Sequence, residues 1–197
     1  MGTATSRVAY AALAAAVLAG AGGCGSSGQA SGGAPRARGG FARVLPAPPP
    51  ATWHAFRIDS GAVLFYPPGW MRASGDPGTA TATLSGAHGH LLGYLNLTPR
   101  QGGETLANWA RFRVAHNVRE GDRAVMSEAS VSGIRFRTGT GTCVRDRYIT
   151  TSGARYIELA CLVKGAVASS VIVAASPPRA WTRVFPALYR ALSALRT

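Results

Sequence analysis

The sequence has 197 residues, a length that suits one modest domain with appendages. Its formal net charge is +13, from 21 lysines and arginines against 8 acidic residues. This charge either reflects an arginine-rich coding bias or favours anionic partners such as lipid headgroups and wall polymers. Nucleic acid is excluded as a partner because the N-terminus, considered next, directs the chain out of the cell.

The N-terminus is typical of a secretory signal peptide. Arg7 precedes an apolar stretch at residues 8–21, which is shorter than the ~20 residues that a membrane-spanning helix needs. Small residues at positions 21–23 stand before Cys24, an arrangement that resembles the lipobox of bacterial lipoproteins, although Ala21 replaces the usual leucine. The resemblance implies a signal peptide at residues 1–23 and a diacylated Cys24 at the mature N-terminus. Ordinary signal cleavage at a nearby bond is the alternative.

Residues 24–52 are dominated by Gly, Ser, Ala and Pro and lack apolar periodicity. This composition predicts a lipid-anchored, disordered linker. We therefore expect the folded domain at residues 53–197.

Short apolar or alternating segments, separated by turn signals, predict that most of the domain is β-strand. The expected strands are residues 53–59, 62–67, 70–74, 79–85, 90–99, 123–137, 141–150, 154–164 and 169–176. Because no run of helices alternates with them, a parallel doubly wound sheet is disfavoured.

Two segments are expected to be helices. The first, Glu104 to Glu120, has an apolar stripe, and Arg113 inside that stripe is expected to extend to its rim. The stripe consists of Leu106, Ala110, Val114 and Val118. The second helix, near the C-terminus, has an apolar face that begins at Trp181 and runs to Leu195. Pro186 should kink this helix or begin its main part.

Cysteine spacing predicts one disulfide. If Cys24 carries lipid, Cys143 and Cys161 remain as a pair in an oxidising compartment. A three-residue loop at 151–153 would place them directly opposite each other in a hairpin. The same register sets Asp146 opposite Glu158, an unfavourable like-charge pair, so the disulfide carries more weight than the register. Two isolated cysteines do not favour zinc.

The stretch Tyr66-Pro67-Pro68-Gly69-Trp70 ends a predicted hairpin. With the middle helix, Trp181 and the last helix, it resembles the PsbP-like α/β/α sandwich over about residues 56–195. That superfamily includes photosystem PsbP, the yeast Ran nucleotide-release factor and exported lipoproteins of the LpqN type. The resemblance implies an α+β fold in which an antiparallel β-sheet is flanked by helices. Pro67, Pro68, Gly69, Trp70 and Trp181 are then fold anchors. Most members act as non-catalytic partners of other proteins.

Few residues offer chemistry. His88 and His90 would point to one face of a strand, a spacing compatible with metal, but no nearby cysteine or acid completes a ligand set. No serine stands in a nucleophile elbow, and no glycine-rich nucleotide motif follows a strand. We therefore expect no catalytic site, no cofactor and no metal.

The strand acids are expected to form salt bridges on a sheet face. Glu128, Asp146 and Glu158 lie among arginines in sequence, and the alternative is an arginine-lined face that docks an acidic partner or polymer. Those arginines are Arg135, Arg137, Arg145, Arg147 and Arg155. Tyr94, Tyr148 and Tyr156 are expected to pack across strands.

Together these features predict an exported lipoprotein at the outer face of the cytoplasmic membrane. It would be a non-catalytic binding or accessory module, held to the membrane through Cys24 and facing an envelope protein or anionic polymer. The alternatives are a secreted hydrolase or metal-binding protein that uses His88 and His90, or a binder of anionic wall polymer or lipid through surface arginines.

Overall fold

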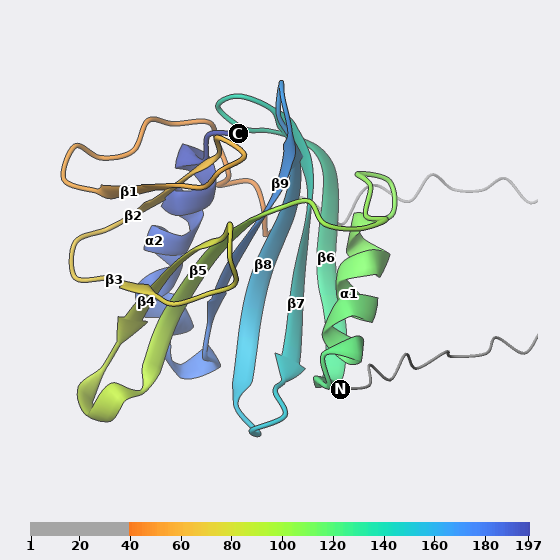
Figure 1. Cartoon of the computed structure of the whole chain (residues 1–197). Coiled ribbons are helices and arrows are strands. Elements are labelled where there is room, and N and C mark those ends of the chain that lie inside the picture. The colour runs from red at the N-terminus through yellow and green to blue at the C-terminus, as the bar shows by residue number, and fades with distance from the viewer. Residues whose placement is uncertain (1–39) are drawn as a thin grey trace, which may run out of the picture. The chain divides into compact units, whose positions relative to one another are not determined.

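The computed structural model describes residues 40–197 and forms one β-sheet layer between two helices (Figure 1). The strands are β1 His54–Arg57, β2 Val63–Tyr66, β3 Met71–Ala73, β4 Ala80–Ser85, β5 Leu91–Pro99, β6 Arg123–Arg135, β7 Thr140–Ile149, β8 Arg155–Lys164 and β9 Ser169–Ser176. The helices are α1 Trp109–Arg119 and α2 Pro178–Ala194, with a 3₁₀ turn, η1, at Ala87–Gly89.

Seven strands form the main sheet, in the order β3-β4-β5-β9-β8-β7-β6, and β1 pairs with β2 in a separate hairpin. Every neighbouring pair is antiparallel. Helix α1 packs on one face, over β6, β7 and β8, and α2 packs on the other face (Figure 1). The predicted α+β fold, an antiparallel sheet flanked by helices, is confirmed.

The sheet buries side chains on both faces because the central residues of β8 and β9 are mostly apolar. Alternate residues such as Leu159 and Ile172 join α2 and the β1–β2 hairpin in the larger core. Their neighbours Ala160 and Val173 lie in a smaller apolar cluster beneath Trp109 of α1. Each face of the sheet therefore has its own hydrophobic core.

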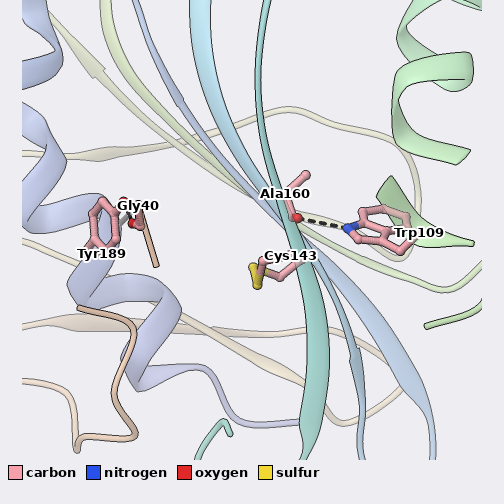
Figure 2. The surroundings of a disulfide bond; sticks show 6 residues. Gly40, Trp109, Cys143, Ala160 and Tyr189 are labelled. Atoms are coloured by element: carbon pink, nitrogen blue, oxygen red, sulfur yellow. Dashed lines mark hydrogen bonds between the residues drawn. A yellow bond between two sulfur atoms is a disulfide. The ribbon is translucent and has the colours of Figure 1, made fainter. Parts of the chain in front are cut away.

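The cysteine hairpin has the predicted register. Cys143 lies opposite Cys161 with their Cα atoms 4.1 Å apart, and the two form a disulfide on the α2 face. Gly153, in the loop, adopts a φ of 85°, the left-handed value that the tight turn needs. The predicted disulfide is confirmed. Figure 2 shows it on the opposite side of the sheet from Trp109.

The stretch from Tyr66 to Trp70 closes the β1–β2 hairpin and leads into β3. Gly69 has a φ of 82°, and the backbone N–H of Trp70 donates to the carbonyl of Pro67 at 3.3 Å. This turn places the Trp70 ring, 6% exposed, in the larger core against Gly93. Trp181 is half-buried at the edge of that core, with the Arg145 guanidinium over its ring.

The first helix differs from its prediction. It begins at Trp109, because a turn precedes it in which Thr105 and Asn108 exchange side-chain hydrogen bonds with each other's backbone N–H. Its buried residues are Trp109 and Asn117, whereas Val118 is 56% exposed. The expected stripe ending at Val118 is therefore wrong. The side of α1 that faces the sheet is partly polar.

The second helix is a single element from Pro178 to Ala194, with Pro178 in its first turn. Pro186 lies on its exposed side and does not begin the main part of the helix. Val184, Leu188 and Leu192 are buried against the sheet, as the apolar periodicity predicts.

The domain begins earlier than residue 53. Phe41 and Val44 are buried in the larger core, and the Tyr189 hydroxyl donates to the carbonyl of Gly40. The backbone N–H of Ala47 donates to the Ser193 carbonyl at 3.1 Å. The prediction of a disordered linker is thus wrong for residues 40–52, because apolar side chains in this segment pack against α2. The signal peptide, Cys24 and the rest of the linker lie outside the described residues.

Candidate functional site

A cavity of about 640 Å³ opens beside α1. Helix α1 covers one half of its sheet face, so the strands β5 and β9 leave a hollow next to it. The cavity lining comprises Asp76, Leu91, Tyr94, Asn96, Thr98, Pro99, Gln101, Gly102, Glu104, Trp109, Phe112, Arg113, His116, Glu120, Tyr148, Tyr156, Glu158, Val171, Val173 and Ala175. Its volume lies within the roughly 300–1,000 Å³ typical of small-molecule sites.

A buried ion pair forms one wall of this cavity. Glu158 on β8 is 0% exposed, and the Arg113 guanidinium of α1 reaches down to it. Arg113 Nε donates to Glu158 Oε1 at 2.6 Å and Nη2 donates to Oε2 at 2.8 Å. The Tyr148 hydroxyl donates to the same Oε2 at 3.0 Å. Both carboxylate oxygens therefore have charged or polar partners, as a buried charge requires.

Burial and the charges of the ion pair shift the pKa values of Arg113, Tyr148 and His116. Burial opposes the charge of Arg113, but the Glu158 carboxylate outweighs it and raises the pKa of that guanidinium. Burial and the Glu158 charge raise the pKa of the Tyr148 hydroxyl, which stays protonated and donates. Burial and the nearby Arg113 charge lower the pKa of His116, so its imidazole is neutral at pH 7.

Asp146 lies behind this ion pair, opposite Glu158 on the neighbouring strand β7. Its side chain is fully buried, and neither carboxylate oxygen has a hydrogen-bond partner among the described residues. Burial, followed by the charge of Glu158, raises the pKa of Asp146 to about 8. Asp146 is therefore predominantly protonated at pH 7.

Aromatic rings line much of the remaining wall. On α1, the rings of Trp109 and Phe112 stack with centroids 6.2 Å apart, and on the strands those of Tyr148 and Tyr156 lie 5.9 Å apart. The Trp109 indole N–H donates to the Ala160 carbonyl of β8 at 2.9 Å (Figure 2). This bond ties the start of α1 to the sheet and so fixes that side of the cavity.

Comparison with solved structures establishes the fold. The domain is similar to cyanobacterial PsbP (CyanoP) from Synechocystis, with a TM-score of 0.54 at 14% identity over 75% of this chain and 94% of that one. The chain has the PsbP-like fold. LpqN of Mycobacterium tuberculosis, described as involved in cell envelope biogenesis, is similar with a TM-score of 0.39 at 12% identity over 74% of this chain and 78% of that one.

A protein from Pseudomonas aeruginosa is also similar to the PsbP-like domain, with a TM-score of 0.48 at 13% identity over 74% of this chain and 96% of that one. In sequence, no family model matches and no curated protein is significantly similar. The PsbP-like resemblance of the sequence is therefore supported at the level of fold.

The histidine pair lies elsewhere in the PsbP-like domain. His88 and His90 are exposed at η1, where His88 has a φ of 61°. They are not on a strand, so the expected common strand face does not form. Within residues 40–197, no group of three or more His, Cys, Asp or Glu side chains is placed to hold a metal ion.

The strand acids occupy opposite faces of the sheet. Glu128 pairs with Arg145 at 2.8 Å and also with Arg147, which is the expected salt-bridge arrangement. On the α1 face, buried Glu158 also forms a salt bridge, although with Arg113 of the helix and not with a strand arginine. Buried Asp146 forms no salt bridge among the described residues, so the prediction is wrong for Asp146. Arg113 is also misplaced by the sequence prediction, because its guanidinium points inward to Glu158 rather than to the rim.

Sequence reasoning missed the cavity but contained two signals of it. Arg113 interrupts the apolar arc of its helix, and Glu158 interrupts the apolar strand β8. Because a buried charge needs a partner of opposite charge, an arginine and a glutamate at such positions can be predicted to pair with each other. The tyrosines expected to pack across strands, Tyr94, Tyr148 and Tyr156, all line the cavity.

Proposed function

We propose that this protein is a non-catalytic binding module, held at the outer face of the cytoplasmic membrane by lipid on Cys24, whose ligand enters the cavity beside α1. The observation that carries the proposal is the cavity itself, which combines apolar walls with a few fixed polar groups. Such a combination is typical of binding sites. The binding partner is then an envelope component. It is either the ligand itself or a larger molecule of which the ligand is a part.

The ion pair favours binding over catalysis. A general acid or base needs a free oxygen or proton to exchange with a substrate. Both carboxylate oxygens of Glu158 are engaged, by two hydrogen bonds from Arg113 and one from Tyr148. These groups therefore form a rigid wall against which a ligand can bind and do not present a reactive group to it.

The anchor is proposed from the sequence around Cys24. Among residues 40–197, no helix is both long and apolar enough to cross a membrane. Mass spectrometry of the mature protein tests the anchor, with a diacylglyceryl mass on Cys24 as the expected result. Cys24→Ser should then move the protein from the detergent phase to the aqueous phase in phase partitioning. An unlipidated mature protein that starts at another residue would overturn the anchor.

The cavity is tested separately, on the full chain. Thr98, half-buried in the lining on β5, is replaced by tryptophan to fill the space. Small molecules of cationic, neutral and anionic classes are then screened by thermal unfolding. We expect at least one class to raise the Tm of the parent chain and to have no effect on Thr98→Trp. Equal shifts in both chains, or no shift in the parent, would overturn a binding role for this cavity.

A further inference from the structure

The acidic residues of this protein are concentrated at one cavity. The sequence has 8 acids against 21 lysines and arginines. Four of those acids, Asp76, Glu104, Glu120 and Glu158, line the cavity beside α1, whereas Arg113 is the one arginine or lysine in the lining. The chain as a whole is strongly basic, but acidic residues outnumber lysines and arginines in the lining of this cavity.

The charge of the lining is not cancelled from within. Arg113 is committed to Glu158 through two hydrogen bonds and neutralises that carboxylate only. Asp76 and Glu120 lie exposed, and His116, the remaining nitrogen base of the lining, is only half-buried. Arg100, outside the lining, donates to the backbone carbonyl of Glu104 at 3.4 Å. The lining itself carries a surplus of negative charge, which attracts cations.

Glu104 supplies a second and independent sign of a missing ligand. It is 4% exposed, and its Oε1 accepts a hydrogen bond from the backbone N–H of Gln101 at 2.8 Å. Its Oε2 is buried and has no hydrogen-bond partner among the described residues. A buried carboxylate oxygen left without a donor is unfavourable, so a donor from a ligand would complete it.

The aromatic walls match the same chemistry. Tyr94, Phe112 and Tyr156 line the cavity together with the acids. Aromatic faces attract ammonium and guanidinium groups, and carboxylates hydrogen-bond to them. On the exposed side of α1, the Arg119 guanidinium already lies 5.6 Å from the Phe112 ring centroid.

Building on the binding function proposed above, we infer that the cavity takes an organic cation, an ammonium or guanidinium group on an apolar stem. The cation would lie near Glu104 and the rim acids, and its stem would contact the aromatic wall. Two sources share this chemistry: a free small amine, or a lysine or arginine side chain of a protein partner.

The test uses phenethylamine, phenethyl alcohol and phenylacetate as cationic, neutral and anionic probes of similar shape. Isothermal titration calorimetry on the full chain should show binding of phenethylamine only. A short lysine peptide and its acetyl-lysine counterpart form a second arm. Binding of the lysine peptide without the free amine would assign the cation to a protein partner, and binding of the free amine would assign it to a small molecule.

Isosteric substitutions locate the cation. Glu104→Gln should weaken binding by roughly tenfold, since it removes a charged acceptor from a buried position. Asp59→Asn is the matched control, because it makes the same charge change at an exposed residue outside the lining, and it should leave the affinity unchanged. Thermal unfolding of each variant checks that the fold is intact.

The outcomes separate this inference from the binding function. If the neutral or anionic probe binds the parent chain and not Thr98→Trp, the cavity binds ligands and the inference of a cation is overturned. Binding of the amine that is equal in Glu104→Gln and the parent would overturn the placement at Glu104. If neither the probes nor the lysine peptide binds, the inference is overturned, whereas the binding function is overturned only if the thermal-unfolding screen above also finds no ligand.

Discussion

Asp146 lies directly opposite Glu158 across β7 and β8, and both carboxyl groups are fully buried on the α1 face of the sheet. A like-charge pair at this spacing is unfavourable in a sheet. The protein tolerates it because Arg113 neutralises Glu158, whereas Asp146 retains its proton with a pKa of about 8. One carboxyl group is charged and paired, and the other is neutral.

This arrangement predicts that stability falls as pH rises. The pKa of Asp146 is about 8 in the folded chain against an ordinary value of 3.8, so between these values the folded state holds a proton that the unfolded state has lost. The stabilisation is complete below pH 3.8 and is lost as pH rises toward 8. One such proton changes the free energy of unfolding by up to about 1.4 kcal/mol per pH unit.

Asp146→Asn should remove that pH dependence. Asparagine keeps the shape of the protonated acid and cannot ionise, so we expect the variant to gain stability relative to the parent chain at pH 8 more than at pH 5. Urea denaturation at both pH values measures the difference, with Asp59→Asn as an exposed control. If both chains had the same pH slope, Asp146 would not hold the proton.

Loss of Arg113 should strongly destabilise the fold. Arg113→Met leaves the Glu158 carboxylate buried without its cation, which typically costs about 3–5 kcal/mol. Arg111→Met, at an exposed position on the same helix, should change the free energy of unfolding by less than about 0.5 kcal/mol. Adding Glu158→Leu to Arg113→Met should recover most of the loss in chemical denaturation. No recovery would show that Arg113 stabilises by packing alone.

Gly93 on β5 allows the Trp70 ring to reach the core. A Cβ atom at residue 93 would lie 2.6 Å from Cη2 of Trp70, closer than atoms can approach. Gly93→Ala should therefore destabilise the domain by about 1–3 kcal/mol. Gly103→Ala is the control, because a Cβ there meets no atom within 4 Å.

A double-mutant cycle tests this contact. Trp70→Phe should lower the cost of Gly93→Ala, since the smaller ring leaves room for the methyl group. Additive effects in thermal unfolding would contradict a direct clash between residues 70 and 93.

The segment before residue 53 should contribute to stability. Phe41→Ala removes a ring that is 4% exposed in the larger core, and such truncations typically cost about 3–5 kcal/mol. Leu45→Ala, at a side chain that is 65% exposed, should have little effect. If Phe41→Ala left the denaturation midpoint unchanged, the domain would begin near Trp53.

Local patterns accounted for most of the fold. Alternation within segments such as residues 141–150, and the turn chemistry of Gly153, act over a few residues, so they predict strands, hairpins and the Cys143–Cys161 pairing directly. The apolar face of α2 has the helical period, and its burial follows from that. What these patterns lack is any record of which elements far apart in sequence lie side by side.

The sequence by itself therefore determined the strands and the disulfide, because both rest on short-range periodicity and spacing, and the PsbP-like architecture was implied by its resemblance to that superfamily. Only the tertiary structure decided that Arg113 reaches Glu158, 45 residues away, and that Phe41 returns to α2. It also decided which acids gather at the cavity. These contacts depend on long-range packing, where a charge inside an apolar pattern finds its partner only after the sheet and helices have assembled.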